Sequence, residues 1–218
     1  MVSRPLAKTF LRGFTLIEMM AVVSIIAIMA ALATPSVLEI LRERHSQRDA
    51  SDLMLVLQDA RSRAYGRGSA TRARWDAAGA GGRGLLSVRE AMFDADGDKK
   101  GDVPSPSCVA CEEGSSTAGC TNFWNQTQSF FQVDGAEQRT VIELTVGRTG
   151  AIKATRDFCF TPQGRTYEWD TTKATYVPLS GVYVFNVYKA YSGTYDNSAT
   201  APRRRVLLGP NGVARLEL

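Results

Sequence analysis

The sequence predicts an α+β protein in which a long N-terminal helix leads into a head built on an antiparallel β-sheet. Residues 14–33 form one apolar run, and apolar residues keep helical spacing to about residue 65. From residue 69, short alternating or apolar segments lie between turns rich in Gly, Pro, Asn and Asp. Short strands joined by short turns favour antiparallel pairing, so we expect two packed sheets with the helix across one face.

The apolar run has the dimensions of a transmembrane helix, which we predict over residues 14–35. It contains one charged residue, Glu18, and a 20-residue helix spans roughly 30 Å, the thickness of the hydrocarbon core of a bilayer. A carboxylate there is costly, so Glu18 calls for a partner. The alternative is a secretory signal peptide cut before Thr34, because Ala31-Leu32-Ala33 resembles an A-x-A cleavage site. The run is, however, longer than the apolar core of most signal peptides.

An amphipathic helix is predicted to follow over residues 36–66, beyond Pro35. Gly66 and Gly68 mark its end, and charged residues occupy its other faces. Its apolar stripe needs a surface to pack on, which the rest of the chain must supply. The residues of the stripe are Val37, Leu38, Leu41, Ala50, Leu53, Met54, Leu57, Ala60 and Ala64.

The β-rich head is predicted over residues 67–218. One segment, 103–138, has no strand pattern and is predicted to be an irregular loop. The candidate strands are 70–76, 84–93, 140–146, 156–161, 165–169, 181–189, 203–208 and 213–218.

Composition argues against an enzyme and gives little support to nucleic-acid binding. The chain has 218 residues and a formal net charge of +4, of which Arg4, Lys8 and Arg12 supply three charges. Without residues 1–13 the net charge falls to about +1. The single histidine, His45, lies in the predicted helix, and the sequence contains neither a G-x-S-x-G motif nor a P-loop. We therefore expect no catalytic centre and no cofactor.

The segment Gly13-Phe14-Thr15-Leu16-Ile17-Glu18 resembles the cleavage motif of type IV pilins and type II secretion pseudopilins. The resemblance implies that residues 1–13 are a leader, which a prepilin peptidase cuts after Gly13, and that Phe14 becomes N-methylated. It also implies a single-pass anchor in the bacterial inner membrane, with membrane lipid around the helix and the head in the periplasm. Other pilin or pseudopilin subunits and an inner-membrane assembly platform would be its partners. Glu18 would pair with the positive N-terminus of a neighbouring subunit.

The head resembles the GspH/FimT branch of that family, which implies a minor pilin or minor pseudopilin. The segment Phe160-Thr161-Pro162-Gln163-Gly164 is similar to its F-x-P-x-G element, and residues 206–215 are similar to its C-terminal hairpin. The segment 103–138 has no clear counterpart in the branch. The resemblance leaves open whether the subunit belongs to a pilus or to a secretion machine.

Arginines near the C-terminus raise the alternative of DNA binding. Some FimT-like subunits bind DNA through this region, and basic side chains would contact phosphates without reading sequence. The family's DNA-binding motif is Gly-Arg-x-Arg, whereas Gly212-Val213-Ala214-Arg215 has Val213 in place of the first Arg. The competing interpretation is an exposed strand whose charges prevent edge-to-edge pairing. The candidate DNA contacts are Arg203, Arg204, Arg205 and Arg215.

Four cysteines, Cys108, Cys111, Cys120 and Cys159, are predicted to form two disulfides rather than a zinc site. Only one pair has metal-like spacing, and an exported domain favours oxidation. Four cysteines allow three pairings, and the sequence does not choose among them.

The acidic segment 94–102, DADGDKKGD, is a candidate calcium loop. Its ligands would be Asp94, Asp96, Asp98 and Asp102. The spacing departs from an EF-hand, because Gly97 precedes Asp98 and no carboxylate occupies the twelfth position. A solvated turn is the alternative.

Overall fold

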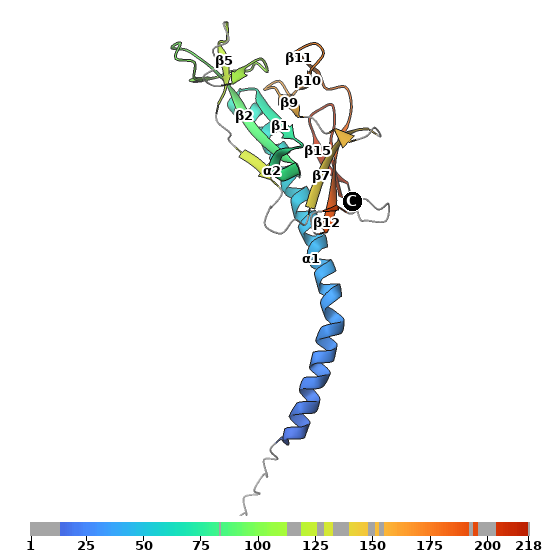
Figure 1. Cartoon of the computed structure of the whole chain (residues 1–218). Coiled ribbons are helices and arrows are strands. Elements are labelled where there is room, and N and C mark those ends of the chain that lie inside the picture. The colour runs from blue at the N-terminus through green and yellow to red at the C-terminus, as the bar shows by residue number, and fades with distance from the viewer. Residues whose placement is uncertain are drawn as a thin grey trace, which may run out of the picture. The chain divides into compact units, whose positions relative to one another are not determined.

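The computed structural model describes residues 14–82, 84–112, 119–125, 129–132, 140–147, 151–152, 155–191, 194–195 and 204–217. A long helix, α1, is followed by a head of two β-sheets, which confirms the predicted α+β class with an N-terminal helix (Figure 1). The chain divides into two compact units, Met1–Leu41 and Arg42–Leu218, which we treat separately. The predicted leader, residues 1–13, lies outside the described residues.

Helix α1 (Leu16–Arg67) begins and ends at residues suited to those positions. The hydroxyl of Thr15 accepts a hydrogen bond from the backbone N–H of Glu18 at 3.3 Å, as an N-cap residue does. At the other end, Gly68 has a φ of 68°, the left-handed conformation that commonly terminates a helix. The helix continues through Pro35, so the apolar and amphipathic segments form one element.

The first sheet crosses the head in the order β11-β10-β9-β1-β2-β5-β4, with β3 and β6 also paired to β2. All its described pairs are antiparallel except β4 with β5. The strands are β1 (Thr71–Asp76), β2 (Leu85–Phe93), β3 (Val103–Pro104), β4 (Cys111–Glu112), β5 (Asn122–Trp124), β6 (Ser129–Gln132), β9 (Arg156–Phe160), β10 (Thr166–Asp170) and β11 (Thr175–Pro178). A short helix, α2 (Gly79–Gly82), connects β1 to β2.

The second sheet has the order β15-β14-β12-β7-β8, with β13 paired to β12. It is antiparallel throughout its described pairs. Its strands are β7 (Thr140–Val146), β8 (Ala151–Ile152), β12 (Tyr183–Tyr191), β13 (Thr194–Tyr195), β14 (Arg204–Leu208) and β15 (Ala214–Glu217). The two predicted sheets are therefore both present.

One hydrophobic core joins the two sheets to α1 within the second unit. Trp75 of β1 and Phe185 of β12 meet edge to face at 5.4 Å between ring centroids, which links the sheets directly. The helix contributes a fully buried stripe: Ala50, Leu53, Leu57, Ala60 and Ala64. Val37 and Leu41, also predicted for that stripe, belong to the first unit and are exposed.

The segment 103–138 was wrongly predicted to be wholly irregular. It contains β3, β4, β5 and β6, which have between two and four residues each. Such strands are too short to show an alternating pattern, and their pairing to β2 or to one another defines them. These four strands thereby become part of the first sheet.

Candidate functional site

The start of α1 is an apolar surface that its own chain leaves uncovered. The stretch Leu16–Thr34 has a mean hydropathy of 2.5, none of it is buried, and its length and composition suit a membrane span. Apolar side chains face every direction around it, as in helices that lie in a membrane or inside a bundle. Glu18 is the single charged residue on this stretch and is also exposed.

Thr15 and Glu18 have the spacing of a capping box, Ser/Thr-x-x-Glu. Phe14 precedes this cap, lies outside the helix and is 77% exposed. Gly13, on the other side of the predicted cut, lies outside the described residues. The position that would become the new N-terminus is therefore accessible and lies at the positive end of the helix dipole.

Residues 12–34 match the family described as the prokaryotic N-terminal methylation motif. This match supports a type IV pilin-like or pseudopilin subunit. The motif implies processing by a prepilin peptidase and assembly with other pilin subunits. The family that carries this motif is structural rather than enzymatic. Together with the apolar helix, the motif is consistent with membrane anchoring and a periplasmic head. No curated protein and no solved structure matches the chain.

The four candidate calcium ligands come together. Oxygen atoms of Asp94, Asp96, Asp98 and Asp102 lie within 4.8 Å of one another. Asp94 accepts hydrogen bonds from the backbone N–H groups of Gly97 and Lys99, at 2.7 and 3.0 Å. Desolvation acts to raise the pKa of Asp94, but these N–H groups outweigh it and hold the pKa below its ordinary value. The carboxylates thus already organise the turn, and calcium binding stays a prediction.

The structure separates Arg204 from Arg205 in the predicted basic patch. Arg204 of β14 forms an ion pair with Glu43 of α1, whereas Arg205 pairs with Glu217 of β15 at 3.6 Å. Neighbouring residues of a strand point to opposite faces, so these two arginines do not form one surface. Arg215 is exposed, and Arg203 lies outside the described residues.

The cysteines form two disulfides, as predicted, and their pairing is now defined. Cys108 is bonded to Cys159, with their Cα atoms 6.0 Å apart, and Cys111 to Cys120, at 6.3 Å. The first bond ties the segment after β3 to β9 in the middle of the sheet. The second closes a short loop on that segment.

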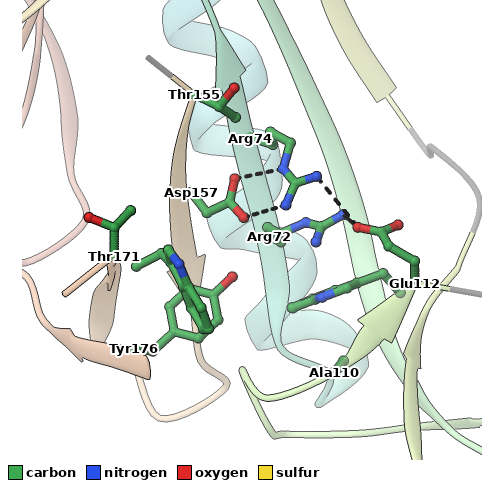
Figure 2. A pocket seen from close by; sticks show the side chains of 10 residues that line it. Arg72, Arg74, Ala110, Glu112, Thr155, Asp157, Thr171 and Tyr176 are labelled. Atoms are coloured by element: carbon green, nitrogen blue, oxygen red, sulfur yellow. Dashed lines mark hydrogen bonds and ion pairs between the residues drawn. The ribbon is translucent and has the colours of Figure 1, made fainter. Parts of the chain in front are cut away.

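A cleft of about 500 Å³ that the sequence did not reveal lies on the face of the first sheet opposite the core (Figure 2). Strand register places charged residues there, because Arg74 lies opposite Asp157 and Arg72 opposite both Cys159 and Arg89. We call this site the arginine cleft. The residues that line it are Arg72, Arg74, Ala110, Glu112, Trp124, Thr155, Asp157, Trp169, Thr171 and Tyr176.

Two arginines from β1 form the floor of the arginine cleft. Arg74 donates two parallel hydrogen bonds to Asp157, each 2.7 Å long, which raise the pKa of Arg74. Arg72 contacts Glu112 at 2.8 Å and lies over the ring of Trp124 at 4.7 Å. Burial, and then the charge of Arg74, lower the pKa of Arg72.

A wall of the cleft beside the two arginines is aromatic. Trp169 of β10 and Tyr176 of β11 meet at 5.1 Å between ring centroids, with an angle of 73° between their planes. Burial raises the pKa of the Tyr176 hydroxyl above its ordinary value. The cleft therefore combines guanidinium groups on one side with rings on the other, as Figure 2 shows for Arg74 and Tyr176.

Proposed function

We propose that the chain is a minor pilin or minor pseudopilin of the GspH/FimT branch. Prepilin peptidase cuts it between Gly13 and Phe14, and Phe14 is then N-methylated. Helix α1 holds the subunit in the inner membrane with the head in the periplasm, and later inserts into a type IV pilus or type II secretion pseudopilus. The observation that carries this proposal is the uncovered apolar stretch Leu16–Thr34, which coincides with the methylation motif.

The exposed stretch explains why such a subunit needs two successive environments. Large apolar side chains on every face of a helix are stable only when lipid or other helices cover them. Lipid covers Leu16–Thr34 before assembly, and the equivalent helices of neighbours cover it afterwards. In such a helix bundle Glu18 needs a cation, which the N-terminal amine of a neighbouring subunit supplies.

The F-x-P-x-G element supports the assignment to the GspH/FimT branch, and its terminal glycine occupies a position that favours glycine. Gly164 has a φ of 80°, and a Cβ atom there would lie 2.1 Å from the hydroxyl of Tyr65 on α1. Phe160, at the start of the element, is buried in the core. The element thus lets the turn after β9 approach the end of α1 closely.

The DNA-binding alternative has less support from the described residues. Arg204 and Arg205 each have a carboxylate partner and face opposite ways, and among the described residues of that group Arg205 and Arg215 are exposed. A phosphate backbone would have to compete with both ion pairs.

Mass spectrometry of the N-terminus tests the proposal against the signal-peptide alternative. Chains recovered from membranes should begin at N-methylated Phe14. An Ala33→Leu control should be processed in the same way, because it alters the A-x-A sequence alone. A Gly13→Leu chain should stay uncut. A mature chain that begins at Thr34 would overturn the proposal and establish a secretory signal peptide.

A further inference from the structure

We propose that the arginine cleft binds a neutral saccharide, with one pyranose ring stacked on Trp169. This inference concerns the outer face of the first sheet and does not depend on the proposed function. The cleft volume of about 500 Å³ lies within the range of roughly 300–1,000 Å³ that is usual for small-molecule sites.

The charges that line the cleft balance one another. The lining contains two guanidinium groups, those of Arg72 and Arg74, and two carboxylates, those of Glu112 and Asp157. Arg72 pairs with Glu112 at 2.8 Å, and Arg74 pairs with Asp157 at 2.7 Å. An anionic ligand would have to displace a carboxylate, and a cationic ligand a guanidinium, and either exchange leaves a charge without its partner. The lining therefore favours a ligand without charge.

Arg74 and Glu112 present a hydrogen-bond donor and an acceptor side by side at the surface of the cleft. Their side chains are 38% and 48% exposed, and the contact between them is long, at 3.5 Å. Arg74 also donates two bonds to Asp157, which hold its guanidinium plane in position. A hydroxyl group both donates and accepts, so neighbouring hydroxyls of one sugar can bond to Arg74 and to Glu112 without breaking the ion pairs.

The aromatic wall determines the body of the ligand. Trp169 and Tyr176 are half-buried, and their ring planes meet at 73°, so the two rings form a corner. Trp124, the other ring of the lining, is buried, and Arg72 lies over it. A pyranose with equatorial hydroxyls has apolar C–H groups on its faces and hydroxyls around its rim. Such a ring stacks on an exposed aromatic surface while its rim reaches the polar groups.

Both disulfides hold the segment that carries Glu112, so the cleft exists before a ligand arrives. Glu112 follows Cys111 directly, and Cys111 is bonded to Cys120. The Cys108–Cys159 bond fixes the same segment to β9, two residues from Asp157. A preformed site loses less conformational freedom on binding than a mobile loop does.

Acrylamide quenching of tryptophan fluorescence tests this proposal on the full-length mature chain, in a detergent whose head group is not a sugar. All three tryptophans lie in the described part of the chain; Trp75 and Trp124 are buried and Trp169 is half-buried, so quenching reports mainly on Trp169. The probes are cellobiose, sorbitol and benzoate. Cellobiose should protect at a concentration about tenfold lower than either of the others, because sorbitol has no rigid apolar face and benzoate is an anion.

Substitutions locate the binding site, with isothermal titration calorimetry as the measurement. Trp169→Leu should weaken cellobiose binding about fivefold or more through lost ring contact, whereas Trp169→Tyr, which keeps a ring, should retain most of the affinity. Arg205→Gln, on the second sheet, should leave binding unchanged; circular dichroism checks that each variant is folded. Equal protection by cellobiose and sorbitol, an unaltered Trp169→Leu variant, or no protection by cellobiose up to about 20 mM would each overturn the proposal.

Discussion

Glu18 takes part in the start of α1 through its backbone and, as we propose, in assembly through its carboxylate. Its backbone N–H is satisfied by the Thr15 hydroxyl at 3.3 Å, so the residue helps to start the helix. Its carboxylate remains exposed on an apolar surface. A carboxylate in lipid raises the free energy of the protein unless an opposite charge pairs with it. In the proposed filament that opposite charge is the N-terminal amine of a neighbouring subunit.

Replacement of Glu18 by alanine should block filament assembly and leave processing intact. The variant loses a charge pair within an apolar bundle but gains apolar character for membrane insertion. We expect its abundance in sheared filaments to fall about tenfold or more, by quantitative immunoblotting, with unchanged abundance in membranes. Glu18→Gln should behave likewise, since it keeps the shape and removes the charge. Ser24→Ala in the same helix is the control, and normal assembly of the Glu18→Ala chain would refute the charge-pair role.

Predictions about single residues are confirmed where the feature consists of residues that are close together in the sequence. The methylation motif lies in one short segment, so the sequence alone indicates it. The arginine cleft draws on residues of β1, β4, β9, β10 and β11. Strand pairing brings Arg74 to Asp157 across 83 positions, and no local pattern encodes that distance.

The two disulfides differ in the length of chain that each one closes, which predicts different effects on stability. Cys108–Cys159 spans 51 positions and Cys111–Cys120 spans 9. From loop-closure entropy, removal should lower the free energy of unfolding by about 4 and about 3 kcal/mol, respectively. Two double variants remove one disulfide each and leave no unpaired thiol: Cys108→Ala with Cys159→Ala, and Cys111→Ala with Cys120→Ala. Denaturant unfolding followed by tryptophan fluorescence measures both.

The order of these two effects is the informative result. Cys159 is fully buried in β9, so its pair also loses packing against Trp124 and Ala91. A larger loss of unfolding free energy on removal of Cys111–Cys120 would contradict this order. It would mean that the bond which closes the longer loop, Cys108–Cys159, is not the main anchor of the segment after β3.

At the level of elements, the sequence predicted the long strands and missed most of the strands of two to four residues. The β7 strand, Thr140–Val146, coincides with the predicted segment 140–146, because its residues alternate between buried and half-buried positions. The β11 strand was missed, since its residues are exposed or half-buried without alternation and it ends at Pro178. The disulfide pairing also depended on the fold, because spacing permits all three arrangements.

The whole molecule is close to neutral once residues 1–13 are removed, which bears on its binding to nucleic acid. A net charge of about +1 gives weak long-range attraction to phosphates. We expect the mature chain to leave a DNA duplex unshifted in electrophoresis at physiological salt. A shift that disappears on replacing Arg204, Arg205 and Arg215 by glutamine, and that weakens steeply with added salt, would instead favour the DNA-uptake alternative.

The attachment of α1 to the head has a mechanical consequence for the proposed filament under tension. The five buried residues between Ala50 and Ala64 lie along the helix axis, so a pull along α1 loads them together in shear rather than peeling them apart in turn. Ion pairs flank this stripe, Glu43 with Arg204 before it and Arg67 with Glu90 after it. Force on the helix is thereby shared between both sheets, and the head should detach only when the whole stripe slips.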